Sequence, residues 1–146
     1  MNLKKKLAGT TGVLVLSAGL LGVGVATAPA AHAATTCTTL VTTNMGSQYW
    51  ADQPSTNSWS TNCVLSQGSQ GLAVRALQQS LKNCVDSWTR TNITVDGQFG
   101  PLTAQAVRRA QAKYGSAVDG VYGPNTRNAM RWWSKNYNGG ANACRG

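Results

Sequence analysis

The chain has 146 residues, of which 13 are Lys or Arg, four are Asp, none is Glu and one is His. The only histidine, His32, lies in the N-terminal segment that we expect to be cleaved off, which excludes a His-liganded zinc centre, and the four cysteines lack the paired short spacings of a four-cysteine zinc site. Few residue types therefore remain for catalysis, and we expect no metal and no cofactor.

Residues 1–33 have the organisation of a secretory signal peptide. Three lysines precede an apolar run, and Ala31, His32 and Ala33 form a small-x-small cleavage motif. A membrane anchor is the alternative, but Gly, Ser and Ala interrupt the apolar run. We expect cleavage after Ala33, which removes the only histidine and leaves a secreted chain with no membrane segment. A Ser or Cys nucleophile would then lack its histidine base.

Cleavage leaves ten Lys and Arg against four Asp, so the mature net charge is +6 (13 − 3 − 4). An exported basic protein meets cell-wall polymers, whose carboxylates and phosphates attract it as nucleic acid would. We expect an anionic wall partner and no specific nucleic acid; a role in solubility alone is the alternative.

Residues 34–62 are rich in Thr, Ser and Asn, a composition typical of a solvated linker. Cys37, Tyr49, Trp50 and Trp59 are unusual in a free linker, however. We predict an irregular N-terminal arm that a disulfide and aromatic contacts fasten to the rest of the chain.

A turn followed by a helix start is repeated in the next region. Residues 95–107 read VDGQFGPLTAQAV and residues 118–130 read VDGVYGPNTRNAM. Asp-Gly favours a turn because Asp bonds its own backbone and Gly accepts a positive φ, and Pro is compatible with a first helical turn. The predicted structural turn positions are Asp96, Gly97 and Gly100, and Asp119, Gly120 and Gly123.

Two aspartates could in principle serve as the acid and base of a glycosidase. The paired candidates here are Asp96 and Asp119, and each stands in an Asp-Gly turn. We therefore assign both to turn structure and expect no catalytic residues.

Apolar residues recur at helical spacing over residues 103–114 and 126–137, and more faintly over 74–85 after a Gly-x-x-Gly turn. One apolar stripe per helix is too little to stand alone in water. We predict a mainly α fold, a small three-helix orthogonal bundle of turn-helix repeats, over residues 63–137. Residues 138–146 form a C-terminal tail.

The four cysteines allow three disulfide pairings. Cys63 precedes the first predicted helix and Cys84 ends it, so their pairing would close that unit and leave Cys37 to meet Cys144. We rank this pairing first; the other two stay open.

Three segments carry a family resemblance: GSQGLAVRALQQSL, VDGQFGPLTAQAVRRAQ and VDGVYGPNTRNAM. They resemble the peptidoglycan-binding domain family, a three-helix module often attached to secreted wall hydrolases, over residues 63–137. The resemblance implies noncovalent binding to the cell wall. One departure is Ala110, where the family commonly has an aromatic before Gln111; Trp88 or Trp133 would fill the gap. No catalytic domain is attached, which implies action alone or in trans.

The second and third predicted helices supply four of the ligand-binding candidates. Trp132 and Trp133 would point about 100° apart on the third helix, with Trp133 in the core and Trp132 outward, where its flat face suits a sugar ring. Packing against the arm is the alternative for Trp132. Arg127, Arg131 and Arg108 could grip carboxylates, although solvated surface charge is the commoner role.

The two turns supply the remaining candidates. Phe99 and Tyr122 occupy matching places, where covering the core is the favoured role and ligand contact the alternative. Gln98 and Asn125 could present their amides to a ligand.

These observations predict a secreted, non-catalytic monomer that binds the glycan or the stem peptide of peptidoglycan. Two alternatives remain: an accessory or inhibitor protein that binds a separately encoded cell-wall hydrolase, and a nonspecific polyanion binder.

Overall fold

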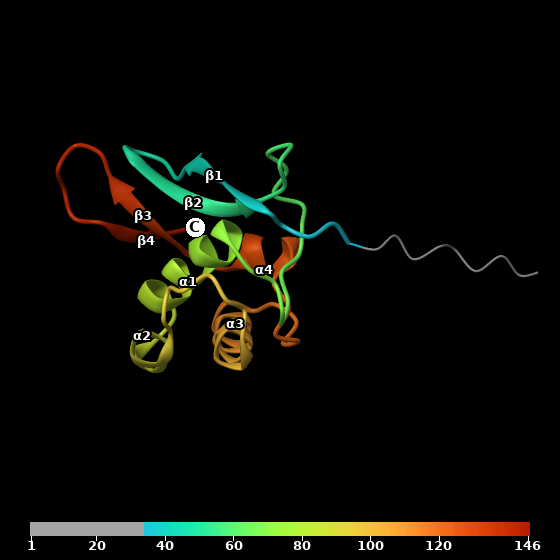
Figure 1. The fold of residues 1–146 in the computed structure, drawn as a ribbon. Helices are drawn as coiled ribbons and strands as arrows, with labels where there is room; N and C mark the ends of the chain where they lie inside the picture. Colours follow the sequence, from blue (N-terminus) through green and yellow to red (C-terminus); the bar gives the residue numbers. More distant parts are fainter. Residues whose placement is uncertain (1–33) are drawn as a thin grey trace, which may run out of the picture. The chain divides into compact units, whose positions relative to one another are not determined.

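The computed structural model describes residues 34–146; the expected signal peptide lies outside the described residues. Figure 1 shows the strands on one side of α1, and α2 and α3 on the other. Within residues 34–146 no helix is long and apolar enough to cross a membrane. The elements are β1 (Thr39–Asn44), β2 (Tyr49–Ser55), α1 (Leu72–Cys84), α2 (Ser87–Asn92), α3 (Pro101–Tyr114), α4 (Pro124–Ala129), β3 (Trp132–Asn136) and β4 (Ala143–Arg145).

The helices α3 and α4 begin in the same way. Gly100 and Gly123 are their N-cap residues, and Pro101 and Pro124 occupy the first turn, where a missing N–H costs nothing. The helix α3 ends at Gly115, which adopts a left-handed conformation with φ 80°. The sequence repeat at residues 95–107 and 118–130 thus encodes two equivalent helix starts.

The strands form one antiparallel sheet in the order β1-β2-β3-β4. Six residue pairs join β1 to β2, from Thr39 opposite Ser55 to Asn44 opposite Trp50. Only two pairs join β2 to β3, and one of them places Trp50 opposite Lys135. The first and last parts of the described chain therefore meet in one sheet.

The predicted mainly α three-helix bundle is wrong. The helix α4 ends at Ala129, and Met130 is extended with φ −78° and ψ 160°. Residues 132–136 then pair with both β2 and β4, while the predicted irregular arm supplies β1 and β2. Backbone pairing with strands distant in sequence overrides the helical spacing of the apolar residues.

The core is continuous between the helices and the sheet. Leu77 and Leu81 of α1 and Val107 of α3 are fully buried in the same cluster as Trp132. The ring of Trp132 meets that of Tyr122 edge to face, with centroids 6.1 Å apart. Aromatic packing of this kind adds to the area that each ring buries.

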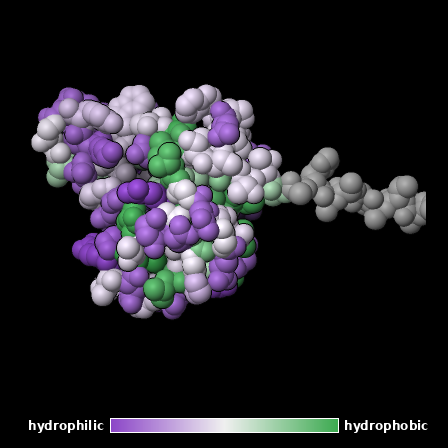
Figure 2. All heavy atoms as spheres, viewed as in Figure 1, coloured by the Kyte–Doolittle hydropathy of each residue, from purple (hydrophilic) through white to green (hydrophobic). Residues whose placement is uncertain are grey.

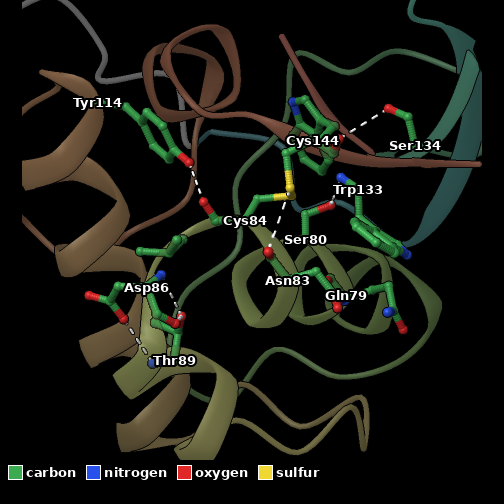
Figure 3. Close-up of a disulfide and its surroundings, with 12 residues drawn as sticks. Gln79, Ser80, Asn83, Cys84, Asp86, Thr89, Tyr114, Trp133, Ser134 and Cys144 are labelled. Carbon is green, nitrogen blue, oxygen red and sulfur yellow. Dashed lines mark hydrogen bonds between the residues drawn. A yellow bond between two sulfur atoms is a disulfide. The ribbon is translucent and has the colours of Figure 1, made fainter. Parts of the chain in front are cut away.

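The predicted disulfide pairing is also wrong. Cys37 pairs with Cys63, and Cys84 pairs with Cys144 (Figure 3). The first bridge encloses the β1–β2 hairpin, and the second ties β4 to the end of α1. Because the hairpin of β3 and β4 returns the chain to α1, it brings Cys144 to Cys84. The paired cysteines are 26 and 60 residues apart in sequence. Because each bridge restricts the unfolded chain, loops of these lengths correspond to a stabilisation of about 3.5 and about 4.3 kcal/mol.

Candidate ligand-binding site

The buried side chain of Gln111 organises the second Asp-Gly turn. Its amide nitrogen donates to Asp119 Oδ1 at 2.7 Å, Val121 O at 3.0 Å and Thr126 Oγ1 at 3.0 Å. Its amide oxygen accepts from the backbone N–H groups of Asp119 and Gly120 at 3.1 and 2.9 Å. One glutamine thus joins α3, the turn and α4.

Gln78 on α1 performs the same task for the first turn. Its amide nitrogen donates to Asp96 Oδ1 at 2.8 Å and Gln98 O at 2.9 Å, and its oxygen accepts from Gly97 N at 2.8 Å. It also donates to Thr103 Oγ1 at 3.2 Å. Four of the five hydrogen bonds of Gln111 have a counterpart at Gln78, the exception being the one from the Asp119 backbone N–H, so the sequence repeat is also largely a repeat of hydrogen bonding.

Each buried glutamine is preceded by an arginine one helical turn earlier, and the side chain of that arginine lies against the glycine of the turn. A Cβ atom on Gly97 would lie 3.0 Å from Arg75 Cγ, and one on Gly120 would lie 2.8 Å from Arg108 Cζ. Both glycines have positive φ, 81° and 78°, which side chains disfavour. The two glycines therefore provide both the turn and the surface against which an arginine lies.

Hydrogen bonds hold the pKa of both turn aspartates below its usual value. The backbone N–H of Gln98 is the largest cause at Asp96, and that of Val121 is the largest cause at Asp119, where partial burial opposes it. Both carboxylates are therefore ionised at neutral pH and engaged as acceptors. Neither is suited to donate a proton as a general acid.

Three of the predicted ligand-binding residues are in the interior. Phe99 is buried, and burial raises the pKa of the Tyr122 hydroxyl above its usual value. Trp132 is only 1% exposed, so its predicted outward position is wrong. Because residue 132 lies in a strand, alternation along β3 turns Trp132 inward and leaves Trp133 half-buried on the other face.

The other five predicted residues do not converge on one site. Gln98 and Asn125 line two separate small hollows, of about 170 and 180 Å³. Arg108 lies over Gly120, and Arg131 is exposed. Arg127 is partly buried, and its backbone carbonyl accepts from Trp132 Nε1 at 3.2 Å.

A larger cleft, of about 330 Å³, lies between α1 and the sheet; we call it the α1–sheet groove. None of the predicted ligand-binding residues lines it. Trp50, Asp52, Trp133 and Lys135 line it from the sheet. Leu40 of β1 also lines it from the sheet, and its remaining lining residues are Leu72, Arg75, Ala76, Gln79, Ser80 and Val95.

Strand register places the sheet side of the groove. Trp50 and Asp52 are two residues apart on β2. Lys135 is opposite Trp50 and two residues from Trp133 on β3. These four side chains therefore share one face of the sheet. The backbone N–H of Trp133 donates to Ser80 Oγ at 3.1 Å, which fixes β3 against α1 (Figure 3).

Asp52 of the groove makes two polar contacts within the sheet. Lys135 Nζ is 3.7 Å from Asp52 Oδ2, and both side chains are substantially exposed. Asp52 Oδ1 accepts from the Thr42 hydroxyl at 2.8 Å. Because an exposed ion pair is worth little, these groups are free to exchange partners with a ligand.

Comparison with known proteins identifies the helical part. Residues 70–130 match the family model described as "Putative peptidoglycan binding domain". The match confirms, for this segment, the resemblance to the peptidoglycan-binding domain family. Over 106 residues the chain is 39% identical to a zinc D-Ala-D-Ala carboxypeptidase of Streptomyces albus G, covering 72% of this chain and 38% of that protein. The chain thus spans well under half the length of this relative.

Two solved structures are also similar. The SleB N-terminal domain is 36% identical, with 46% of this chain and 86% of that chain covered and a TM-score of 0.39. A peptidoglycan-binding protein from Clostridioides difficile, solved in complex with glutamine hydroxamate, is 29% identical, with 61% and 54% covered and a TM-score of 0.42.

The α1–sheet groove is only partly made of the peptidoglycan-binding domain segment. Its five sheet residues, Leu40, Trp50, Asp52, Trp133 and Lys135, all lie outside residues 70–130. Sequence reasoning missed this site because it treated Trp133 as helical. The dipeptide Asn138-Gly139, a strong hairpin signal between residues 132–136 and 143–145, could have indicated the strands.

Proposed function

We propose that this chain is a secreted, non-catalytic protein that binds bacterial peptidoglycan noncovalently. The observation that carries the proposal is the match of residues 70–130 to the peptidoglycan-binding domain family, with both Asp-Gly turns built around a buried glutamine. The mature charge of +6 favours a polymer that carries carboxylates and phosphates. The signal-peptide pattern of residues 1–33 supports secretion.

The structural roles of three of the four aspartates and of all four cysteines support binding without catalysis. The carboxylates of Asp96 and Asp119 belong to the turns, and Asp86 caps α2 and binds Arg109 with an N–O distance of 2.6 Å. All four cysteines are in disulfides. These carboxylates and sulfur atoms are therefore engaged in structural contacts, whereas catalysis would need carboxylates or thiols that are free to react.

The relative from Streptomyces albus G is named a zinc enzyme, and the chain matches 38% of it. Residues 34–146 contain no histidine and no group of three potential metal ligands. The residues described here thus do not fit a zinc site of that kind. We assign to this chain the wall attachment and not the carboxypeptidase chemistry.

Cosedimentation of the oxidised mature protein with insoluble peptidoglycan, stripped of teichoic acid, tests the proposal. The measurement is made at low salt and at about 0.5 M salt, where charges are screened within a few ångströms. We expect retention in both conditions. Release at high salt would indicate a nonspecific polyanion binder, and no retention in either would favour a protein partner such as a wall hydrolase.

Incubation of isolated wall with the purified chain tests the absence of catalysis. We expect no new reducing ends and no released peptides. Cleavage that an Asp96→Asn variant abolishes would overturn the non-catalytic assignment.

A further inference from the structure

We propose that the α1–sheet groove is the site that holds the glycan strand of peptidoglycan. This inference rests on the proposed function and adds the location of the site and the part of the polymer that it takes. The groove brings Trp50 and Trp133 of the sheet beside Arg75 and Gln79 of α1. The combination of flat apolar faces with charged and amide groups matches the chemistry of an anionic wall saccharide.

The two tryptophans supply the apolar part of the site. Trp50 is 37% exposed although β2 is an inner strand of the described sheet, and Trp133 is half-buried on the same face. An exposed tryptophan offers a flat surface on which the C–H face of a sugar ring can pack, while its ring N–H is free to donate. The two side chains are therefore the expected anchors for sugar rings.

Arg75 supplies a positive charge that no carboxylate of the described residues neutralises. The salt bridges among residues 34–146 join Arg109 to Asp86 and Lys135 to Asp52, so Arg75 takes part in neither. Its aliphatic stem lies against Gly97, which limits the directions in which the guanidinium can point. A positioned guanidinium at the edge of a groove can bind a carboxylate through two hydrogen bonds.

The remaining polar groups suit sugar hydroxyl and acetamido groups. Asp52 can accept from a hydroxyl, and Lys135 and Gln79 can donate to oxygen atoms. The groove, at about 330 Å³, lies within the usual range of ligand pockets, about 300–1,000 Å³, whereas the hollows at the two turns are about half this size. The groove is therefore the better-sized site for part of a glycan strand.

The test compares four variants of the full mature protein, paired by residue type. Trp50→Ala and Arg75→Gln alter the groove. Trp59→Ala removes a tryptophan that is 68% exposed in a loop, and Arg90→Gln removes an exposed arginine of α2; neither residue lines the groove. Binding is measured to insoluble peptidoglycan and to glycan strands freed of their stem peptides by an amidase. Circular dichroism and thermal unfolding establish that each variant is folded.

We expect the wild type, Trp59→Ala and Arg90→Gln to bind both probes equally well at about 0.5 M salt. We expect Trp50→Ala and Arg75→Gln each to lose about tenfold or more in affinity, as anchor residues do. Because Arg75 is exposed, its variant keeps the test decisive even if Trp50→Ala fails to fold.

Three other outcomes would overturn, respectively, the location of the site, the assignment to glycan, and the proposed function together with the site. If the wild type binds wall and Arg75→Gln binds equally well, the groove is not the site, although the proposed function stands. If the wild type binds insoluble wall but not free glycan strands, the assignment to glycan is wrong. If the wild type binds neither probe, both the proposed function and the site are wrong.

Discussion

Replacing Gln111 by Ala tests whether the buried glutamine holds the second turn together. The side chain makes five hydrogen bonds of 2.7–3.1 Å, and its residue is 1% exposed. Truncation removes all five at once. The exposed partner, Asp119, can turn to water, but Gly120 is buried and its N–H has no other acceptor among the described residues.

The expected loss of stability follows from these contacts. One buried N–H left without a partner costs about 1–3 kcal/mol, and the net value of each other hydrogen bond is about 0.5–1.5 kcal/mol. Water at the exposed end recovers part of the loss, and the higher helix propensity of Ala offsets a few tenths more. We expect the free energy of unfolding of Gln111→Ala to fall by about 3 kcal/mol.

Urea unfolding of the oxidised mature protein, followed by tryptophan fluorescence, measures this change. The matched control is Gln105→Ala, because Gln105 is exposed on the same helix; we expect a change within about 0.5 kcal/mol. A loss below about 1 kcal/mol for Gln111→Ala, with an unchanged m-value, would refute the view that this glutamine organises the turn.

Three further predictions concern the same scaffold. Replacing Cys84 and Cys144 together by Ser should lower the free energy of unfolding by about 4 kcal/mol, and retention of full stability in urea would contradict this. Gly120→Ala should destabilise more than Gly139→Ala, because both have positive φ but only Gly120 faces an arginine that a Cβ would touch; equal changes in Tm would show that this contact is unimportant. Since the turn carboxylates have lowered pKa values when folded, the stability that they add is present above the unfolded value of about 3.9 and is lost as the pH falls. The acid loss of Tm should therefore be smaller in Asp119→Asn, and an identical acid profile would argue against this linkage.

The local elements of the helical half could be predicted from sequence. Glycine, proline and apolar spacing indicated the starts of α3 and α4. The two Asp-Gly turns were predictable for the same reason, because a turn depends on the φ preferences and side-chain hydrogen bonds of a few adjacent residues. The family resemblance followed from these same short segments, and the family match over residues 70–130 confirms it.

The buried glutamines show where local reasoning begins to fail. The sequence places Gln78 and Gln111 at matching helical positions, but a polar residue in an apolar stripe does not reveal its partners. Those partners lie 18–25 residues away for Gln78 and 8–15 residues away for Gln111. Only the folded chain shows that the amides hold the turns.

By itself the sequence determined the repeated turn-helix units, their resemblance to the peptidoglycan-binding domain family and the basic charge, because each depends on neighbouring residues or on composition. The tertiary structure decided that Trp132 is buried, which cysteines pair and that Trp50 and Trp133 line one groove. Residues 132–136 continue a helical apolar spacing and yet form a strand. In the strand their backbone groups pair with β2 and β4, whereas a third helix here would leave the backbone groups of β2 and β4 without these partners. Local preference is worth tenths of a kcal/mol per residue, and such long-range pairing outweighs it.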